Sequence, residues 1–562
     1  MCGIWAILNG DSNSKYYDSF LKIENRGPDR SSYIKMNEFI KMYFGFHRLA
    51  IMDRSTKGDQ PFMIEDDNRT IICLCNGEIY NYLDIINSTK IELNSGSDCE
   101  TIPRLYIKYG FYNTIKMLQG EFVIILIDFD HINNIVKFYT ARDPLGIRPL
   151  FYSENNKCIM FSSELKGINN ITDPTTIKRF PPNHILEGFY NKNDSYKIKL
   201  NYYLYKYSDY TKQILSENIT NNMNYIFELI RDQLETSVIS MLQSDRPLGA
   251  LLSGGLDSSL VVSIASYYLN KQNKKLKTFS IGMPNGTDEK YARMVADYCH
   301  TDHTHIEFSQ DDFCNAIEDV IKTIESYDIT TVRASTGQYL ISKWISQYTD
   351  IKVLLIGDGS DELTCGYMYF HKAPSPIDAH NENIRLLEEI HIYDVLRADR
   401  GIAGNGLEAR VPFLDPNFVQ LYLSIPPALR IPKDGIEKWL LRKSFDVSDI
   451  NIRETFKNKV EYLPKEVLYR KKEAFSDGVS GLQKSWYQII QEKVETLYTD
   501  DYLEKCKSKY KINIPHTKEA LYYREIYEKY YPNTDHLIPH YWLPKWCGNI
   551  TEPSARVLQV YK

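Results

Sequence analysis

The sequence of 562 residues lacks several features that mark particular classes of protein. Its ten cysteines are scattered and form no Cys-x-x-Cys pair, which argues against a disulfide scaffold and for a reduced, cytoplasmic protein. The longest apolar run, residues 122–127, is far shorter than the about 20 residues that span a bilayer. The first ten residues have no basic segment and no cleavage site, so we expect neither a signal peptide nor a membrane partner.

A concentration of positive charge is also missing. The net charge is −6 and no basic block stands out, so the electrostatic footprint of a nucleic-acid-binding protein is absent. Hydrophobic residues make up 43% and charged residues 25%, as in ordinary globular proteins. This much apolar material is enough for more than one core.

The first third of the chain is rich in short β-branched and aromatic segments that are bounded by Gly, Asn, Asp and Pro. We expect strands at residues 3–8, 42–46, 70–75, 121–129, 135–141 and 159–162. One helix is expected from Asp98 to Tyr109, with Gly110 as its C-cap. Strands in series with few helices predict packed antiparallel sheets.

A polar stretch without clear periodicity separates this region from the rest. We place a linker at residues 196–222, between a first domain at 2–195 and a second at 223–550. Helical segments (225–243, 258–269) then alternate with strand segments (248–252, 276–282, 305–308, 352–356). This alternation predicts an α/β domain with a parallel sheet covered on both faces, and the last third, from about Asp394, is mainly helical.

Cys2 follows Met1 directly. If Met1 is removed, the residue carries both a thiol and a free α-amine, whose pKa near 8 lets it accept the thiol proton. Such a residue is a nucleophile with its own base. The alternative is that a cysteine at this position has no role.

Three further features would suit the hydrolysis of glutamine by such a thiol. Arg48 can offer a bidentate fork to the α-carboxylate, and Asp98 can pair with the α-ammonium. At the end of a predicted strand, the Asn76 amide and the Gly77 N–H can form an oxyanion hole. Each also has a simpler explanation: Arg48 as a surface cation, Asn76-Gly77 as a hairpin turn and Asp98 as an N-cap.

The motifs that contain these residues occur in a fixed order: MCGI (1–4), RGPD (26–29), RLAIMD (48–53), NGEIYN (76–81) and SGSD (95–98). Together they resemble the class II glutamine amidotransferase domain. The resemblance implies an N-terminal-nucleophile (αββα) sandwich, with Cys2 as nucleophile and Asn76 and Gly77 as the oxyanion hole. It also implies a glutamine pocket formed by Arg48, Leu49, Ala50, Ile51, Met52, Asn76, Gly77, Glu78 and Asp98.

A second motif joins a buried strand to an apolar helix through SGGLDSS (253–259). A glycine-rich turn at a helix N-terminus cradles phosphate, because its N–H groups and the helix dipole face the anion. Ser253, Gly254, Gly255, Ser258 and Ser259 would bind ATP, and an Asp257 next to phosphate suggests a Mg²⁺ ligand. The Gly-Lys-[Ser/Thr] ending of a Walker A loop is absent, and the simpler alternative is a flexible turn that caps a helix.

This loop resembles the pyrophosphate loop of N-type ATP pyrophosphatases. A second strand-and-turn segment, LLIGDGSDE (354–362), agrees with it and offers Asp361 as a second Mg²⁺ ligand. Further motifs make the whole chain resemble the asparagine synthetase family, the last two its eukaryotic form: ESYD (325–328), TTVRAS (330–335), DVLRAD (394–399), EARVPFLD (408–415), GIEK (435–438), KEAFSDG (472–478), HYWLPKW (540–546) and PSAR (553–556).

The resemblance implies a reaction in which aspartate is activated by ATP as β-aspartyl-AMP and then takes ammonia released from glutamine. Asparagine, glutamate, AMP and pyrophosphate are the implied products, and a homodimer is the implied assembly. Lys438 would balance charge on the triphosphate, and Leu252, Ile281, Ile356 and Gly357 would hold the nucleotide, largely through backbone atoms. Contacts with pyrophosphate or aspartate are expected from Thr330, Thr331 and Arg333; Asp394 and Arg397 either share that role or pair with each other.

The chain departs from the family at Asp358, where the family has Glu at a position linked to adenylate formation. The carboxylate is kept but its reach is shorter by one methylene, and a misplacement of that order can cost roughly 10²-fold in rate. We expect either a slower adenylation or a shifted loop.

Two alternative functions stay open. One is another AMP-forming synthetase that resembles β-lactam synthetase, a family that typically lacks the N-terminal cysteine retained here. The other is a degenerate, non-catalytic homologue, which only Asp358 favours. A separate group, Cys299, His300, His303 and His305, has a spacing that fits no common zinc site, and we expect surface and strand-edge residues there.

Overall fold

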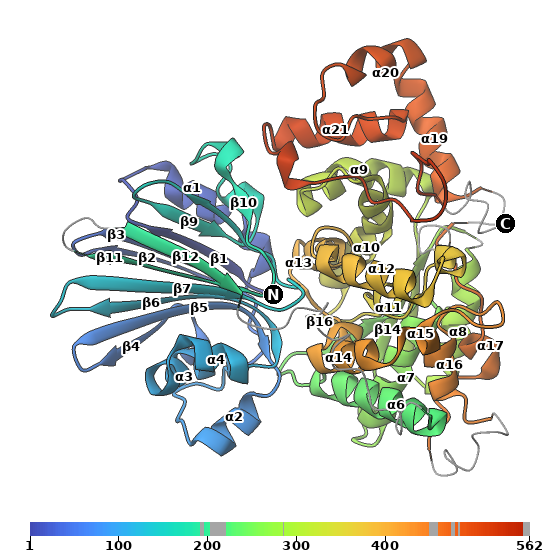
Figure 1. Ribbon diagram of the computed structural model, residues 1–562, viewed down its shortest axis with the longest axis horizontal. Helices are drawn as coiled ribbons and strands as arrows, with labels where there is room; N and C mark the ends of the chain where they lie inside the picture. The colour runs from blue at the N-terminus through green and yellow to red at the C-terminus, as the bar shows by residue number, and fades with distance from the viewer. Residues whose placement is uncertain are drawn as a thin grey trace.

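The computed structural model describes residues 1–191, 196–202, 221–284, 286–448, 459–473, 478–480 and 484–554. Two domains lie side by side, and the chain starts between them (Figure 1). None of the helices among these residues combines the length and apolar character needed to cross a bilayer.

The N-terminal domain contains two antiparallel six-stranded sheets, as expected. The first has the order β10 (Lys178–Arg179), β8 (Phe151–Glu154), β9 (Ile159–Ser162), β1 (Gly3–Leu8), β3 (Lys41–Arg48) and β2 (Arg30–Asn37). The second has the order β12 (Tyr196–Tyr202), β11 (His184–Asn191), β7 (Ile135–Arg142), β6 (Gly120–Asp130), β5 (Arg69–Ile79) and β4 (Phe62–Asp66).

Residue alternation along the strands explains the layers of this domain. On β1, Ile4, Ala6 and Leu8 pack into the core between the sheets, whereas Trp5 and Ile7 pack with α1 (Lys15–Leu21) on the outer face. On β5, the side chains that leave the inter-sheet core pack against α3 (Thr101–Tyr109) and α4 (Phe111–Met117), next to α2 (Tyr82–Thr89). The result is the predicted αββα sandwich.

Two local predictions need correction. Residues 196–202, predicted as the start of the linker, form strand β12, which pairs with β11 across the whole of Tyr196–Tyr202. The rest of the predicted linker up to residue 220 lies outside the described part. The predicted strand 70–75 continues through Asn76 and Gly77 to Ile79. Gly77 marks no turn but a close approach of backbones, because a Cβ there would lie 2.0 Å from the Glu121 carbonyl oxygen.

The second domain is built on a parallel sheet with the order β15 (Asp302–Glu307), β14 (Lys277–Gly282), β13 (Leu248–Leu251), β16 (Val353–Leu355) and β17 (Glu408–Arg410). On one side pack α6 (Met223–Ser240), α7 (Leu256–Asn270) and α8 (Thr287–Cys299); on the other pack α9 (Gln310–Ile324), α10 (Ile329–Tyr348) and α13 (Asp394–Ala403). Strand β13 comes first in sequence but lies in the middle of the sheet. The strand order therefore reverses between β13 and β16, the place where such sheets bind ligands.

The remaining helices complete this domain, as the predicted helical last third requires. They are α11 (Ser360–Leu363), α12 (Pro376–Glu389), α14 (Pro416–Ser424), α15 (Pro427–Arg430), α16 (Trp439–Phe445), α17 (Lys465–Leu468), α19 (Trp486–Leu497), α20 (Asp500–Lys507) and α21 (Lys518–Tyr530). In Figure 1, α19, α20 and α21 form a cap at the end away from α6.

Candidate active sites

Cys2 lies at the start of β1, at the edge of the sandwich that faces the second domain. Its N–H donates to Asn76 Oδ1 (2.8 Å), and its Sγ lies 3.8 Å from the Leu49 carbonyl oxygen. Arg26 Nε donates to the Cys2 carbonyl oxygen at 2.9 Å. Burial raises the pKa of the Cys2 thiol to about 11, so the thiol is protonated at neutral pH and needs a base before it can attack.

Asn76 presents a side-chain donor next to Cys2. Its side chain is fully buried on β5, and its Oδ1 is taken by Cys2. Its Nδ2 has no hydrogen-bond partner among the residues that the structure describes. A buried, unsatisfied donor is costly and therefore marks a place where a ligand atom is expected.

Asp98 lies beside the end of β5, and Arg48 lies at the end of β3; the two differ in how far their charges are already paired. Asp98 is buried and accepts a hydrogen bond from the Ile79 N–H (2.6 Å), and burial raises its pKa to about 6 against the lowering effect of that hydrogen bond. Arg48 is buried and already bonded to Asp59 Oδ1 (2.5 Å) and to carbonyl oxygens of the loop after it. It therefore holds the loop and does not present an empty fork.

The loop that contains Leu49, Ala50, Ile51 and Met52 touches the second domain. Leu49 and Ile51 pack against Val353 at the start of β16, with Met52 beside them. The loop backbone is held as well, because Ala50 N–H donates to Asp29 Oδ2 at 2.9 Å. The backbone that faces Cys2 is thus fixed by packing across the domain interface.

A pocket opens at the carboxyl ends of β13 and β16, where the strand order reverses. Twelve of the residues predicted from the sequence line it: Leu252, Ser253, Gly255, Asp257, Ser258, Ile281, Ile356, Gly357, Asp358, Asp361, Arg397 and Lys438. Gly255 is the N-cap of α7, so the loop and the helix N-terminus face the pocket together. Gly254 has φ +72° and lies against α8, where a Cβ would be 2.5 Å from the Ala292 nitrogen.

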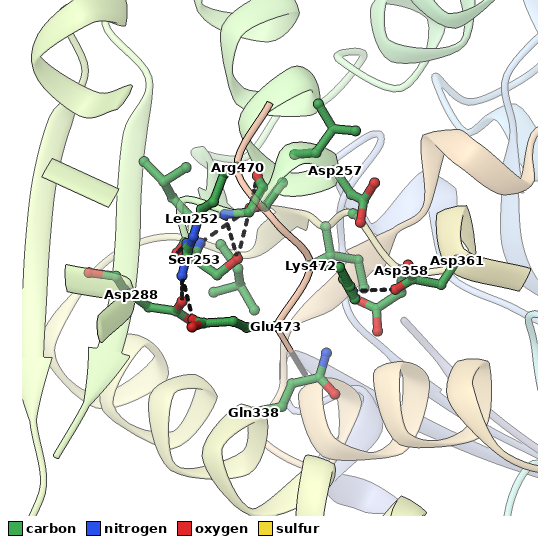
Figure 2. A pocket seen from close by; sticks show the side chains of 18 of the residues that line it. Leu252, Ser253, Asp257, Asp288, Gln338, Asp358, Asp361, Arg470, Lys472 and Glu473 are labelled. Carbon is green, nitrogen blue, oxygen red and sulfur yellow. Dashed lines mark hydrogen bonds and ion pairs between the residues drawn. The ribbon is translucent and has the colours of Figure 1, made fainter. Parts of the chain in front are cut away.

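Paired charges fill one side of this pocket. Lys438 Nζ lies 2.6 Å from Asp257 Oδ2 and 2.6 Å from Asp361 Oδ1. Lys472 Nζ lies 2.5 Å from Asp361 Oδ2 (Figure 2). The two lysines hold the pKa of Asp361 below its usual range despite burial. The carboxylates of Asp257 and Asp361 converge on the Lys438 nitrogen.

Asp358 and Arg397 form a second charged group at the pocket. Arg397 Nη1 lies 2.8 Å from Asp358 Oδ1, and Nη2 lies 2.9 Å from Asp394 Oδ1. Burial raises the pKa of Asp358, while Arg397 opposes that rise. Asp394 and Arg397 do pair with each other, and only Arg397 is part of the pocket lining.

Several predicted residues lie elsewhere. Arg333 pairs with Glu519 (2.5 Å) and Glu552 (2.8 Å), which commits its guanidinium to the helical cap. Thr331 bonds to Asp328, the N-cap of α10. Thr330 and Ser259 are not in the pocket lining. The fold gives partners to Arg333 and Thr331, whereas the hydroxyl oxygens of Thr330 and Ser259 are buried and have no hydrogen-bond partner among the described residues. A contact of these residues with a ligand stays a prediction.

Sequence reasoning missed Lys472, Arg470 and Asp288. Arg470 lies across the pocket from Asp361, where it pairs with Asp288 (2.6 Å) and donates to the Ser253 carbonyl oxygen (3.3 Å) (Figure 2). Lys472 is part of the motif KEAFSDG, but nothing in the sequence around it indicates that it pairs with a carboxylate in a distant segment. Only the fold brings it to Asp361.

Buried charges join the two sites across the domain interface. Arg410 on β17 pairs with Glu78 Oε2 of the N-terminal domain (3.3 Å) and with Glu408 (2.8 Å). The Arg410 carbonyl oxygen accepts from the Ile356 N–H (3.0 Å), at the start of the loop that lines the nucleotide pocket. Arg26 pairs with Asp399 of α13 (2.8 Å). One residue, Arg410, therefore touches both sites.

A thiol site on an αββα sandwich, joined to a phosphate loop on a parallel sheet, defines a two-domain amidotransferase–synthetase. Comparison with family models agrees: residues 1–214 match the glutamine amidotransferase domain, and residues 229–388 and 376–551 match asparagine synthase. The chain belongs to the asparagine synthase family.

Curated relatives extend the match to the full length. The chain is 43% identical to the glutamine-hydrolysing asparagine synthetase of Gallus gallus and 41% identical to that of Cricetulus griseus, covering 100% of this chain and 99% of each relative. Among solved structures, a glutamine phosphoribosylpyrophosphate amidotransferase from B. subtilis matches 54% of this chain and 81% of its own, with 13% identity and a TM-score of 0.31.

Proposed function

We propose that this chain forms asparagine from aspartate, with glutamine as the nitrogen donor and ATP as the energy source. Glutamate, AMP and pyrophosphate are the other products. The observation that carries the proposal is that the thiol site with its unpartnered amide donor and the phosphate loop with its paired carboxylates lie in one chain, on two sides of one buried interface.

Glutamine hydrolysis is assigned to Cys2. After removal of Met1, its α-amine would accept the thiol proton, and Sγ would attack the glutamine amide carbon. Asn76 Nδ2 and the Gly77 N–H would stabilise the oxyanion, and ammonia would leave before water cleaves the thioester. The unpartnered Nδ2 supports this role.

Glutamine would be held by the surrounding loop and strand end. Asp98 would pair with the α-ammonium, with Glu78 and the backbone of Leu49–Met52 completing the pocket. Arg48 would bind the α-carboxylate only if glutamine displaces Asp59 or a carbonyl oxygen from its guanidinium. The proposal therefore includes a local rearrangement at Arg48.

The synthetase step is assigned to the second pocket. The aspartate β-carboxylate attacks the α-phosphate, pyrophosphate leaves, and ammonia then displaces AMP from the acyl carbon. The nucleophile and ATP are both anions, so cations are needed to bring them together. Lys438 and Lys472 supply fixed positive charge, and backbone groups of Leu252, Ile281 and Gly357 would contact the nucleotide.

Mg²⁺ is part of the proposal, with Asp257 and Asp361 as its ligands. The donor set fits, because the carboxylates of Asp257 and Asp361 already converge on the single Lys438 nitrogen at 2.6 Å each. The ion would neutralise phosphate charge when bound. Thr331 and Arg333, which the fold uses elsewhere, are not part of the proposed site.

Ammonia must stay unprotonated between the two sites, because ammonium is not a nucleophile. We therefore include a dry passage along the buried interface, where Arg410 touches both sites. The cytoplasm is the proposed location, and the ten free thiols support it. A homodimer stays a prediction.

One assay tests the proposal. The purified chain, given aspartate and ATP, should form asparagine and AMP in equal amounts with either glutamine or ammonia as donor. If glutamine is hydrolysed but neither donor gives asparagine or AMP, the degenerate homologue replaces this proposal. If AMP forms with another carboxylate but not with aspartate, the alternative synthetase does.

A further inference from the structure

Away from both sites, three potential metal ligands gather at the edge of the parallel sheet. Glu289 comes from the first turn of α8, and His305 and Glu307 come from the edge strand β15. One ligand atom from each lies within 4.8 Å of the other two. None of the three lines the nucleotide pocket.

A contact of the Nδ1 atom orients the His305 ring so that its other nitrogen, Nε2, faces this group. Its side chain is only 3% exposed, and Nδ1 lies 2.8 Å from the Ser280 hydroxyl oxygen on β14. This contact fixes the ring so that Nε2 faces Glu289, whose Oε2 is 3.7 Å away, too far for a hydrogen bond. Metal-binding histidines are usually oriented by an acceptor on the far ring nitrogen, a carboxylate, a carbonyl oxygen or water, and here the Ser280 hydroxyl oxygen occupies that position.

The charges also favour a cation. Two of the three potential ligands are carboxylates, and the third is an imidazole that is almost fully buried beside them. Arg293 Nε binds Glu289 Oε1 at 2.8 Å and leaves Oε2 toward the histidine. The carboxylate of Glu307 on the same strand adds a second negative charge, so one arginine faces two carboxylates.

His303, two residues earlier on β15, shows the contrast. Both of its ring nitrogens are 3.0 Å from hydroxyl oxygens, Nδ1 from Thr278 and Nε2 from Ser280. His303 is therefore committed to packing against β14, as expected for a strand-edge residue. The sequence spacing could not distinguish the two histidines, because Glu289 reaches the group from the preceding helix.

We propose that Glu289, His305 and Glu307 bind one divalent transition-metal ion of the Zn²⁺ type. The ligands are Nε2 and one oxygen from each carboxylate, with water in the remaining positions, since nitrogen and oxygen donors suit such ions. The ion ties the first turn of α8 to β15. Asp288, next to Glu289, pairs with Arg470 in the nucleotide pocket, so the ion steadies that wall of the pocket.

Zn²⁺ binding to the purified full-length chain, measured by calorimetry without nucleotide, tests the proposal. The matched variants are H305Q and E307Q, with H300Q, at an exposed histidine outside the group, as the control. Because changes even in the partners that orient metal ligands cost about 10–100-fold in affinity, H305Q and E307Q should each weaken one binding event by at least about tenfold. H300Q should leave that event unchanged.

The ten cysteines can also bind Zn²⁺, so only the event that differs between variants counts. Glu307 is exposed, and E307Q removes no core contact, which keeps the test valid even if H305Q fails to fold. A binding isotherm of E307Q that matches that of the original chain overturns the proposal, as does the absence of saturable binding. Synthesis with ammonia, measured in parallel, is expected to survive in E307Q, so this test is separate from that of the proposed function.

Discussion

The two proposed reaction sites of this chain would stabilise negative charge in opposite ways. Next to Cys2 lies an uncharged donor, the amide of Asn76, which has no partner among the described residues. In the nucleotide pocket, Lys438 and Lys472 stand against Asp257 and Asp361 at 2.5–2.6 Å. An oxyanion on one carbon needs only preorganised dipoles, whereas a triphosphate that meets a carboxylate needs full charges. The difference predicts that variants at one site spare the other.

Cys2→Ala should give the largest separation between the sites. Loss of the nucleophile should lower glutamine hydrolysis by on the order of 10⁴-fold or more, because the remaining groups cannot form the thioester. Ammonia-dependent synthesis should persist. Asparagine formation with each donor measures both effects, and Cys506→Ala, a half-buried thiol on α20, is the control. Equal loss with both donors would contradict the separation.

Arg410→Met should break the connection between the regions. It leaves Glu78 without this buried partner and removes one of two cations next to Glu408, the other being the Met1 ammonium group. Removal of one member of a buried ion pair costs about 3–5 kcal/mol. Denaturant unfolding should show this loss. Arg410→Met combined with Glu78→Gln should lose less than the sum of the single changes. An unfolding midpoint equal to that of the original chain would mean that the pairing does not hold the interface.

Lys438→Met should show the opposite pattern of activity loss from Cys2→Ala. Without this ammonium, Asp257 and Asp361 repel each other and the triphosphate loses a counter-charge, so synthesis with either donor should fall by roughly 10²–10³-fold. Glutaminase activity should stay. Lys433→Met, at an exposed lysine nearby, is the control. A selective loss of glutamine-dependent synthesis would show that the two regions are not separate.

The smallest expected effect is a pH dependence confined to the glutamine site. Burial raises the pKa of Asp98 from 3.8 to about 6, so the folded chain holds this proton up to a higher pH than the unfolded chain. The contribution of Asp98 to stability is thus present at low pH and is lost as the pH rises through about 6. Glutamine binding should depend on pH in the opposite direction and strengthen as the pH rises, because only the ionised Asp98 carboxylate pairs with an ammonium group.

Glutaminase kcat/KM should therefore fall about tenfold per pH unit below that value. In Asp98→Asn the KM for glutamine should be higher and this acid limb should vanish. An identical acid limb in Asp98→Asn would assign the titration to another group.

The sequence predicted the fold well where periodicity is local, and less well where distant segments meet. Strands β1 and β9 have the predicted bounds, because alternating buried residues and flanking turns define them. Asn76-Gly77 was interpreted as a strand end because glycine usually marks a turn. In the structure, the absence of a side chain at Gly77 allows the backbone of the neighbouring strand to lie close to it.

The same limit applies to the sites. The strand, turn and helix around residues 253–259 were predictable because the serines and glycines of the turn are contiguous. Lys472, Arg470 and Arg410 were not, because their partners lie over a hundred residues away or in the other domain. Arg333 shows the converse: its motif predicted a ligand contact, but Glu519 and Glu552 pair with it.

The ion pairs across the domain interface limit how the chain can be recombined. A foreign amidotransferase grafted onto this synthetase would have to bring a carboxylate to meet Arg410 and a guanidinium to meet Asp399, each at a buried position. Without them, the chimaera would enclose unmatched ions at its junction. The halves are thus exchangeable only as a set with their complementary partners.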